Sequence, residues 1–228
     1  MSVKILSVAK QLPKYTRDTK HIIPFVKLWM QGQEKRFQRK VLKLFEGAGV
    51  DRRYSIMDAE EVFSNSSFEE KNNIYAREVT ALAEQSLKKS LEKASLLSTD
   101  IDYIITVSCT GIMIPSVDAY LINSLQMKQD IVRLPVTEMG CAAGVSGIIY
   151  AKNFLKANPN KRAAVVAVES PTATFQLEDF SMVNIVSAAI FGDGAADQGL
   201  GQGLEHDAAP ELFHHHHAFD RAHAHAAI

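Results

Sequence analysis

Hydrophobic residues follow two different periods along the first 196 residues of the chain. Short, nearly continuous apolar runs are typical of strands that are buried on both faces of a sheet. These runs are residues 3–9, 101–107, 132–137 and 163–168. Between them, apolar residues recur every three or four positions, most clearly over residues 74–91, which indicates amphipathic helices. This alternation predicts an α/β layered fold with a largely parallel sheet.

Local signals mark the ends of several predicted helices. Ser67 and Glu70 have the spacing of a capping box at the start of the longest helical pattern. Gly47 and Gly49 end a basic amphipathic helix. A further helix is expected over residues 182–190, followed by a turn that enters a strand.

The pattern changes after residue 196. Residues 197–228 contain no lysine and seven of the eight histidines, and no helical or strand period is visible among them. We therefore divide the chain into an α/β domain of residues 1–196 and an irregular His/Ala/Gly-rich segment of residues 197–228. Its composition most resembles translation out of frame, with deliberate truncation or an unusual genuine tail as alternatives. The four consecutive histidines, residues 214–217, resemble part of a purification tag or an adventitious metal binder.

Composition and charge exclude several classes of protein. The formal net charge of −1 does not favour binding to nucleic acid or to an anionic membrane. No apolar run reaches the roughly 18 residues of a membrane-spanning helix, and the N-terminus lacks the long apolar region of a signal peptide. Two cysteines do not make a disulfide framework. We expect a soluble cytoplasmic protein with free thiols and no metal site.

Cys141 stands at the sharpest transition in the sequence. The strand-like run of residues 132–137 leads into Cys141, and the small residues that follow predict a thin helix that can be buried between sheets. A thiol at a helix N-terminus faces unpaired backbone amides and the positive end of the helix dipole, and both favour the thiolate. Cys141 is therefore a candidate nucleophile; the alternative is a buried structural cysteine in a tight helix–strand contact.

Residues 138–144 resemble the nucleophile motif of type III polyketide synthases, the chalcone synthase-like branch of the thiolase superfamily. Three other blocks agree with that family in order and spacing, and the resemblance covers residues 1–196. They are residues 108–111 with Pro115, residues 168–170 with 174–175, and the Phe-Gly-Asp-Gly turn at 191–194. The resemblance implies a thiolase-like layered fold, αβαβα when complete, of which this chain holds the N-terminal half.

The resemblance also implies a reaction. Cys141 would accept an acyl group from acyl-CoA or from an acyl carrier protein as a thioester, which splits one acyl transfer into two easier steps. Decarboxylation of malonyl-CoA would then supply the carbanion that attacks this thioester. Acyl-CoA and malonyl-CoA are substrates, and no tightly bound cofactor is implied.

Three further positions fall on the family's cavity. Phe191 matches a phenylalanine that gates the channel between the cofactor tunnel and the cavity, although a core aromatic is an alternative. Thr174 and Cys109 match residues that line the cavity, where side-chain volume sets the size of the product. Cys109 is equally compatible with a small packing residue.

Positions outside the cavity follow from the same resemblance. Ile114 matches a hydrophobic residue that crosses a dimer interface into the cavity of the partner, so a homodimer is implied. Lys40 and Lys43 lie near cations that meet the phosphates of CoA. The alternative for both lysines is the solvated basic face of an amphipathic helix.

The second half of the family fold supplies a His and an Asn that stabilise the developing oxyanions. Nothing after Ala196 resembles that half, so we expect the chain as written to lack both residues and to make no polyketide. The histidines after residue 196 lie in low-complexity sequence and are not assigned a catalytic role. Two rival interpretations remain: an initiating β-ketoacyl-ACP synthase, and a non-catalytic half-domain that only dimerises.

Overall fold

One five-stranded sheet organises the described part of the chain. The computed structural model describes residues 2–202. In spatial order the strands are β1 (Val3–Gln11), β7 (Gly194–Gln202), β6 (Arg162–Glu169), β4 (Tyr103–Val107) and β5 (Val132–Val136). β4 pairs in parallel with β5 and β6, whereas β7 is antiparallel to both β6 and β1. The predicted α/β fold is confirmed, and the antiparallel β7 makes the sheet mixed.

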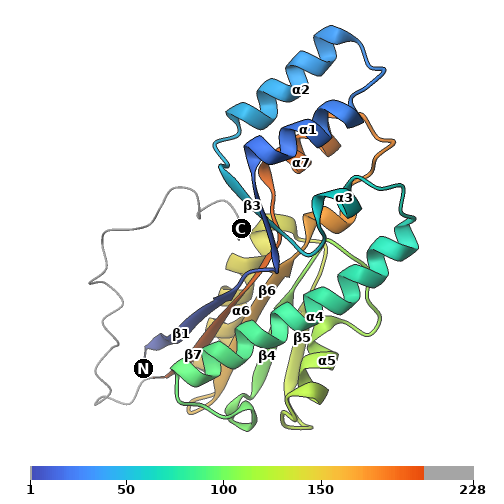
Figure 1. The fold of residues 1–228 in the computed structure, drawn as a ribbon. Coiled ribbons are helices and arrows are strands. Elements are labelled where there is room, and N and C mark those ends of the chain that lie inside the picture. Colours follow the sequence, from blue (N-terminus) through green and yellow to red (C-terminus); the bar gives the residue numbers. More distant parts are fainter. Residues whose placement is uncertain (1, 203–228) are drawn as a thin grey trace.

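Helices cover both faces of the sheet (Figure 1). α4 (Phe68–Lys93) and α5 (Val117–Ser124) lie on one face, and α6 (Ala143–Ala157) lies on the other. The sheet has a hydrophobic core on each face, and successive residues of β4 contribute to different cores. Ile104 packs with the α4 layer and Ile105 packs with the α6 layer. A strand whose alternating side chains are both buried has a continuous apolar sequence, which is the signal seen in residues 101–107.

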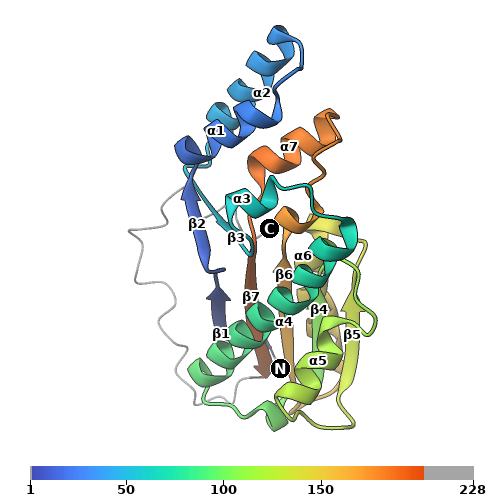
Figure 2. The ribbon, with the colours of Figure 1, turned by 45° about the vertical axis from the view of Figure 1, so that its right-hand side comes forward.

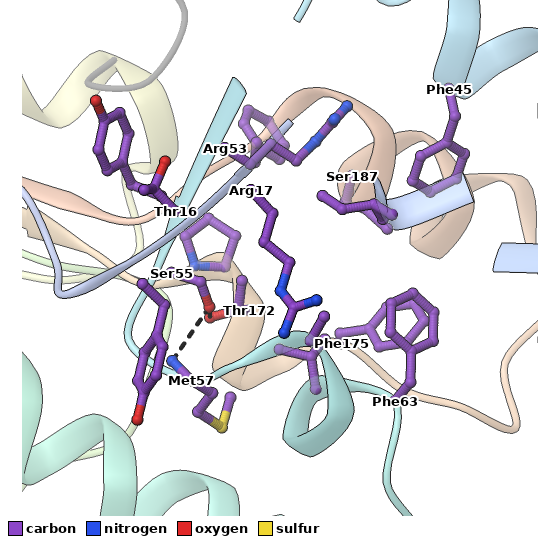
Figure 3. Close-up of a pocket in the computed structure, with 18 residues that line it drawn as sticks. Thr16, Arg17, Phe45, Arg53, Ser55, Met57, Phe63, Thr172, Phe175 and Ser187 are labelled. Atoms are coloured by element: carbon purple, nitrogen blue, oxygen red, sulfur yellow. Dashed lines mark hydrogen bonds between the residues drawn. The ribbon is translucent and has the colours of Figure 1, made fainter. Parts of the chain in front are cut away.

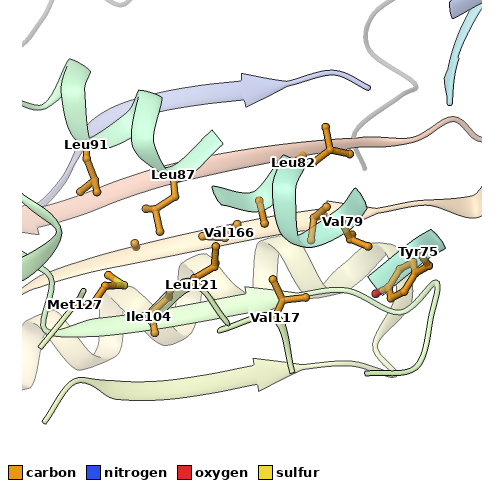
Figure 4. Packing of buried hydrophobic residues seen from close by; sticks show 14 of the residues in the cluster. Tyr75, Val79, Leu82, Leu87, Leu91, Ile104, Val117, Leu121, Met127 and Val166 are labelled. Atoms are coloured by element: carbon orange, nitrogen blue, oxygen red, sulfur yellow. The ribbon is translucent and has the colours of Figure 1, made fainter. Parts of the chain in front are cut away.

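α4 crosses the sheet at the centre of its core (Figure 4). The predicted capping box starts it: the backbone amide of Glu70 donates to Ser67 Oγ, and the Ser67 amide donates to the Glu70 carboxylate at 2.8 Å. Val79 and Leu87 of its apolar stripe are fully buried. Each such side chain contributes about 1.5–3 kcal/mol relative to an exposed position.

α6 is buried on one side only. Ala151 and Leu155 pack on the sheet, where the helix buries no large polar group. Val145 and Ile149, on the outer side, are 61% and 49% exposed. Within residues 2–202 the helix is therefore not enclosed between two sheets, which differs from the expectation raised by its small residues.

A helical cap stands at the carboxyl ends of β4, β5 and β6 (Figure 2). It contains α1 (Thr19–Trp29), α2 (Lys35–Gly47), α3 (Ala59–Val62), α7 (Met182–Ile190) and the antiparallel ribbon of β2 (Tyr15–Asp18) and β3 (Arg52–Ser55). Aromatic rings form its core: the Trp29 ring meets the Phe175 ring edge-on at 5.0 Å between centroids, and Phe63 packs on the same phenylalanine at 5.3 Å. Such aromatic pairs add about 0.5–1.5 kcal/mol beyond the area they bury.

Within residues 2–202, no helix is both long and apolar enough to cross a membrane. The histidines at 214–217 lie outside the described residues.

The boundary expected between residues 196 and 197 falls inside β7. This strand continues to Gln202 and pairs on both sides, with β1 and with β6. Asp197 lies in its interior, fully buried, and neither carboxylate oxygen makes a full hydrogen bond within the described residues. Burial raises the pKa of Asp197 to about 8, and the nearby Ser90 hydroxyl opposes only part of that rise. A poorly matched side chain therefore stands in a strand that is paired on both sides.

We expect Asp197→Val to stabilise the fold by about 1–3 kcal/mol at pH 7, since an unsatisfied buried polar group carries a cost of this size. The folded-state pKa of Asp197 lies above its usual 3.8. The folded state therefore holds the Asp197 proton more tightly than the unfolded state does. As a result, the contribution of this group to the free energy of unfolding is highest below pH 4, where Asp197 is protonated in both states, and it falls as the pH rises to about 8. Urea denaturation at pH 5 and pH 8 measures both effects.

Asp197→Asn serves as the matched control, because it removes the charge and keeps a polar group. The wild-type chain should lose stability between pH 5 and pH 8, and both variants should lose less. A wild-type chain that is more stable than Asp197→Val at pH 8 would contradict this account.

Candidate active site

Cys141 lies in the turn that joins β5 to α6. A single 3-10 turn, η2 (Gly140–Ala142), holds it and runs directly into the helix. Gly140 has a φ of +57°, in the left-handed region that favours glycine, and this residue makes the sharp change of direction possible. The thiol is exposed. The sequence pattern that placed a cysteine at a strand-to-helix turn is therefore reproduced in the fold.

The second thiol, Cys109, lies beside the first. Burial and the Glu169 carboxylate raise the pKa of Cys109 to about 11, and the charge of Cys141 adds to the rise. Glu169 ends β6 and accepts hydrogen bonds from the Cys109 amide at 3.0 Å and from Thr110 Oγ1 at 2.7 Å. This carboxylate was not predicted as a site residue, although it belongs to one of the resembling blocks. After burial, it is the next largest cause that disfavours the Cys109 thiolate.

α4 positions the loop that carries Cys109. The Tyr75 hydroxyl and Ser108 Oγ are 2.6 Å apart, and Asn72 exchanges two hydrogen bonds of 2.9 Å with the backbone of Ile112. Gly111 lies against the ring of Tyr75, where an added Cβ would come within 2.2 Å of a ring carbon. Only a residue without a side chain fits there, so the glycine of this block is required by a close approach.

Asp193 connects the segment after β6 to the cap through hydrogen bonds. Its buried carboxylate accepts hydrogen bonds from the Ile56 amide at 2.8 Å, from Ser170 Oγ at 3.0 Å and from the Thr172 amide at 3.1 Å, as well as from the Thr172 hydroxyl. Burial raises the pKa of Asp193 to about 6, although these four donors oppose the rise. One side chain thereby fixes the end of β3, the turn η3 (Pro171–Thr174) and the start of β7.

A pocket opens beneath the cap, between the β2–β3 ribbon, η3 and α7 (Figure 3). It encloses about 690 Å³ of empty space, part of it open to solvent. Phe191, Thr172 and Phe175 contribute to its wall, whereas neither cysteine does. Arg17 and Arg53 also line it, and sequence patterning had singled out neither as a binding residue.

The other predicted positions are spread over the surface. Thr174 is exposed on η3, and its Oγ1 donates to the carbonyl of Pro171 at 2.9 Å. Ile114 is 94% exposed. Lys40 and Lys43 are exposed on α2. The fold thus brings Cys109 and Cys141 together, places Phe191 at the pocket, and keeps the two lysines on the cap.

The mixed sheet with helices on both faces and a cysteine at the β5–α6 turn define the thiolase-like fold of type III polyketide synthases. The structure of 1,3,6,8-tetrahydroxynaphthalene synthase from Streptomyces coelicolor, a bacterial type III polyketide synthase, matches with a TM-score of 0.81 and 30% identity, over 88% of this chain and 57% of that one. The chain belongs to the chalcone and stilbene synthase family, because the model of the family's N-terminal domain matches residues 3–203.

Two curated relatives agree with this assignment. The 1,3,6,8-tetrahydroxynaphthalene synthase of Streptomyces coelicolor is 37% identical over 155 residues, which cover 68% of this chain and 41% of the relative. The putative chalcone synthase of Bacillus subtilis is 31% identical over 197 residues, 84% of this chain and 54% of the relative. The chain spans about half the length of the curated relatives it matches.

We predict that Cys141 reacts with iodoacetamide faster than Cys109 between pH 6 and 8. Both cysteines are exposed, but Cys141 lies at a helix start, whereas the pKa of Cys109 is raised to about 11. Peptide mass spectrometry after brief labelling reads both sites. Equal labelling of the two thiols in the folded protein would contradict the prediction.

The variant Glu169→Gln tests whether the charge of Glu169 lowers the reactivity of Cys109. Removing the carboxylate charge should lower the pKa of Cys109 and raise its labelling rate severalfold at pH 8, while the rate of Cys141 changes less. Glu178→Gln, an exposed change in the segment before α7, is the matched control and should leave both rates unchanged.

Proposed function

We propose that this chain carries the acyl-accepting part of a type III polyketide synthase. Cys141 attacks the carbonyl of an acyl-CoA or acyl carrier protein thioester, and the acyl group moves to its sulfur as CoA or the carrier thiol leaves. In the whole family reaction, malonyl-CoA would then lose CO2 and the resulting acetyl-CoA carbanion would attack the Cys141 thioester carbonyl, so that the extended chain is carried on CoA and the Cys141 thiolate leaves; that step also uses groups of the family's second half. The observation that carries this proposal is the exposed cysteine at the start of α6 in a chain of this family.

The electrostatics of the two thiols support a single nucleophile. Glu169 lies against Cys109 and disfavours its thiolate, while the backbone amides at the start of α6 face the Cys141 turn. In this proposal Cys109 and Thr174 shape the acyl cavity, and Phe191 controls passage towards it. Lys40 and Lys43 meet the phosphates of CoA, together with the further exposed cations Arg36 and Arg39 of the same helix.

Self-acylation tests the proposal directly. Incubation with hexanoyl-CoA should add one hexanoyl group to the chain, on Cys141, and the adduct should be released by hydroxylamine as expected for a thioester. Cys141→Ala should abolish the adduct, and Cys109→Ala should keep it. Intact-mass and peptide mass spectrometry provide the readout. An adduct that survives in Cys141→Ala would overturn the assignment.

Chain extension is a separate expectation. Condensation is expected only where the His and Asn of the family's second half are also present, so residues 1–202 tested by themselves should form acyl-Cys141 and condense no malonyl-CoA onto it. Loss of a single oxyanion donor already lowers turnover by about 10²–10³-fold. Pyrone or resorcinol products that vanish in Cys141→Ala would show that this chain extends polyketides after all.

We also propose that the chain forms a homodimer through the surface around Ile114. Ile112 and Ile114 are 63% and 94% exposed, in a loop that α4 holds in place. Ile114→Asp should weaken association at least about 10-fold, because it buries a charge in an apolar contact. Leu97→Asp, at a 70% exposed leucine in the turn after α4, is the matched control. Light scattering over a concentration series measures the change, and identical association of both variants would contradict the proposal.

A further inference from the structure

We propose that the pocket beneath the cap binds a monocarboxylate with an apolar body, of the class of a medium-chain fatty acid anion, at a site apart from Cys141. The inference is independent of the polyketide activity. It rests on three features of the pocket: its apolar wall, its two arginines, and its lack of any acidic lining residue.

The wall of the pocket is largely hydrophobic. Ile22, Phe45 and Val62 line it from the cap, and Phe63 and Phe175 line it from the aromatic core. Small-molecule sites are mostly apolar with a few placed polar groups, and the lining of this pocket has that composition. An alkyl chain or an aromatic body suits such a wall better than a nucleotide does.

Arg17 supplies the first placed charge. Its side chain extends from β2 into the pocket, towards Phe63 and Phe175 (Figure 3). Nη2 contacts Glu60 at 2.6 Å, and no other hydrogen bond engages the Arg17 guanidinium within the described residues. Because Glu60 is 59% exposed, this pair contributes little, and a carboxylate in the pocket can replace or share it. The planar guanidinium binds a carboxylate through two parallel hydrogen bonds.

Arg53 supplies the second charge and has no carboxylate partner among the described residues. It is 8% exposed; its Nη atoms donate to Thr19 Oγ1 and to the carbonyl of Ala189, and its Nε has no partner. Burial lowers the pKa of Arg53 to about 10, so the group stays charged at neutral pH. A buried cation without a counter-ion favours an anion nearby.

The balance of charge around the pocket selects the kind of anion. Two cations and no carboxylate line it, and Glu60 at its edge offsets one of them. A single negative charge therefore neutralises the site. A polyphosphate would bring more charge than the two arginines can match.

Fluorescence of Trp29, the chain's single tryptophan, reports on this site. Its ring packs on Phe175 at 5.0 Å and near Phe63 at 6.3 Å between centroids, and both phenylalanines line the pocket. The probe is decanoate, titrated below its micelle concentration, with 1-decanol and decyltrimethylammonium as ligands of equal chain length. Decanoate should change the Trp29 emission saturably and bind at least about 10-fold more tightly than the alcohol, as one well-placed ion pair allows.

Arg17→Gln should weaken decanoate at least about 10-fold and leave 1-decanol binding unchanged. Arg52→Gln is the matched control, because Arg52 lies on the same ribbon but pairs with Asp18 outside the pocket. Ala188→Phe, which fills the pocket, should remove binding of both ligands, and its thermal unfolding curve shows whether the variant still folds. Cys141→Ala should bind decanoate as the wild type does, so this test stands apart from acylation.

The proposal is overturned if decanoate leaves Trp29 emission unchanged, if the alcohol or the cationic ligand binds as tightly as decanoate, or if Arg17→Gln and Arg52→Gln behave alike.

Discussion

The buried carboxylate of Asp193 is the contact on which the arrangement of cap and sheet depends. It accepts hydrogen bonds from the backbone after β3, more than a hundred residues away along the chain, and from Ser170 and the adjoining turn η3. The Ile56 amide and the Ser170 hydroxyl make buried hydrogen bonds to it, and a buried polar group without a partner costs about 1–3 kcal/mol. The pocket beneath the cap and the loop near the thiols both border the segments that this carboxylate fixes.

A second carboxylate, Glu169, separates the roles of two neighbouring cysteines. It holds the loop of Cys109 by hydrogen bonds from backbone and side chain, and the same charge disfavours the Cys109 thiolate. Cys141 lies at a helix start instead, where backbone amides favour negative charge. Position in the fold, rather than residue type, therefore makes Cys141 and not Cys109 the candidate nucleophile.

The two candidate sites draw on different parts of the molecule. The thiols and Glu169 stand at the carboxyl ends of the parallel strands, where the ends of β4, β5 and β6 meet. The pocket instead lies between the ribbon, η3 and α7, and is closed by aromatic side chains of the cap. Phe191, the residue expected to gate a channel, borders this pocket just before the start of β7.

The strands β1, β4, β5 and β6, the capping box of α4 and the turn at Cys141 were predictable from the sequence, because periodicity and capping act over a few residues. The fold alone decided that β7 continues past Ala196, since pairing with β1 and β6 on both sides outweighs the local mismatch of Asp197. It also decided the contacts of Arg53 with Ala189 and of Lys71 with Phe175, which join residues more than a hundred positions apart. No local pattern encodes such pairs, because they form only when the packed chain brings their elements together.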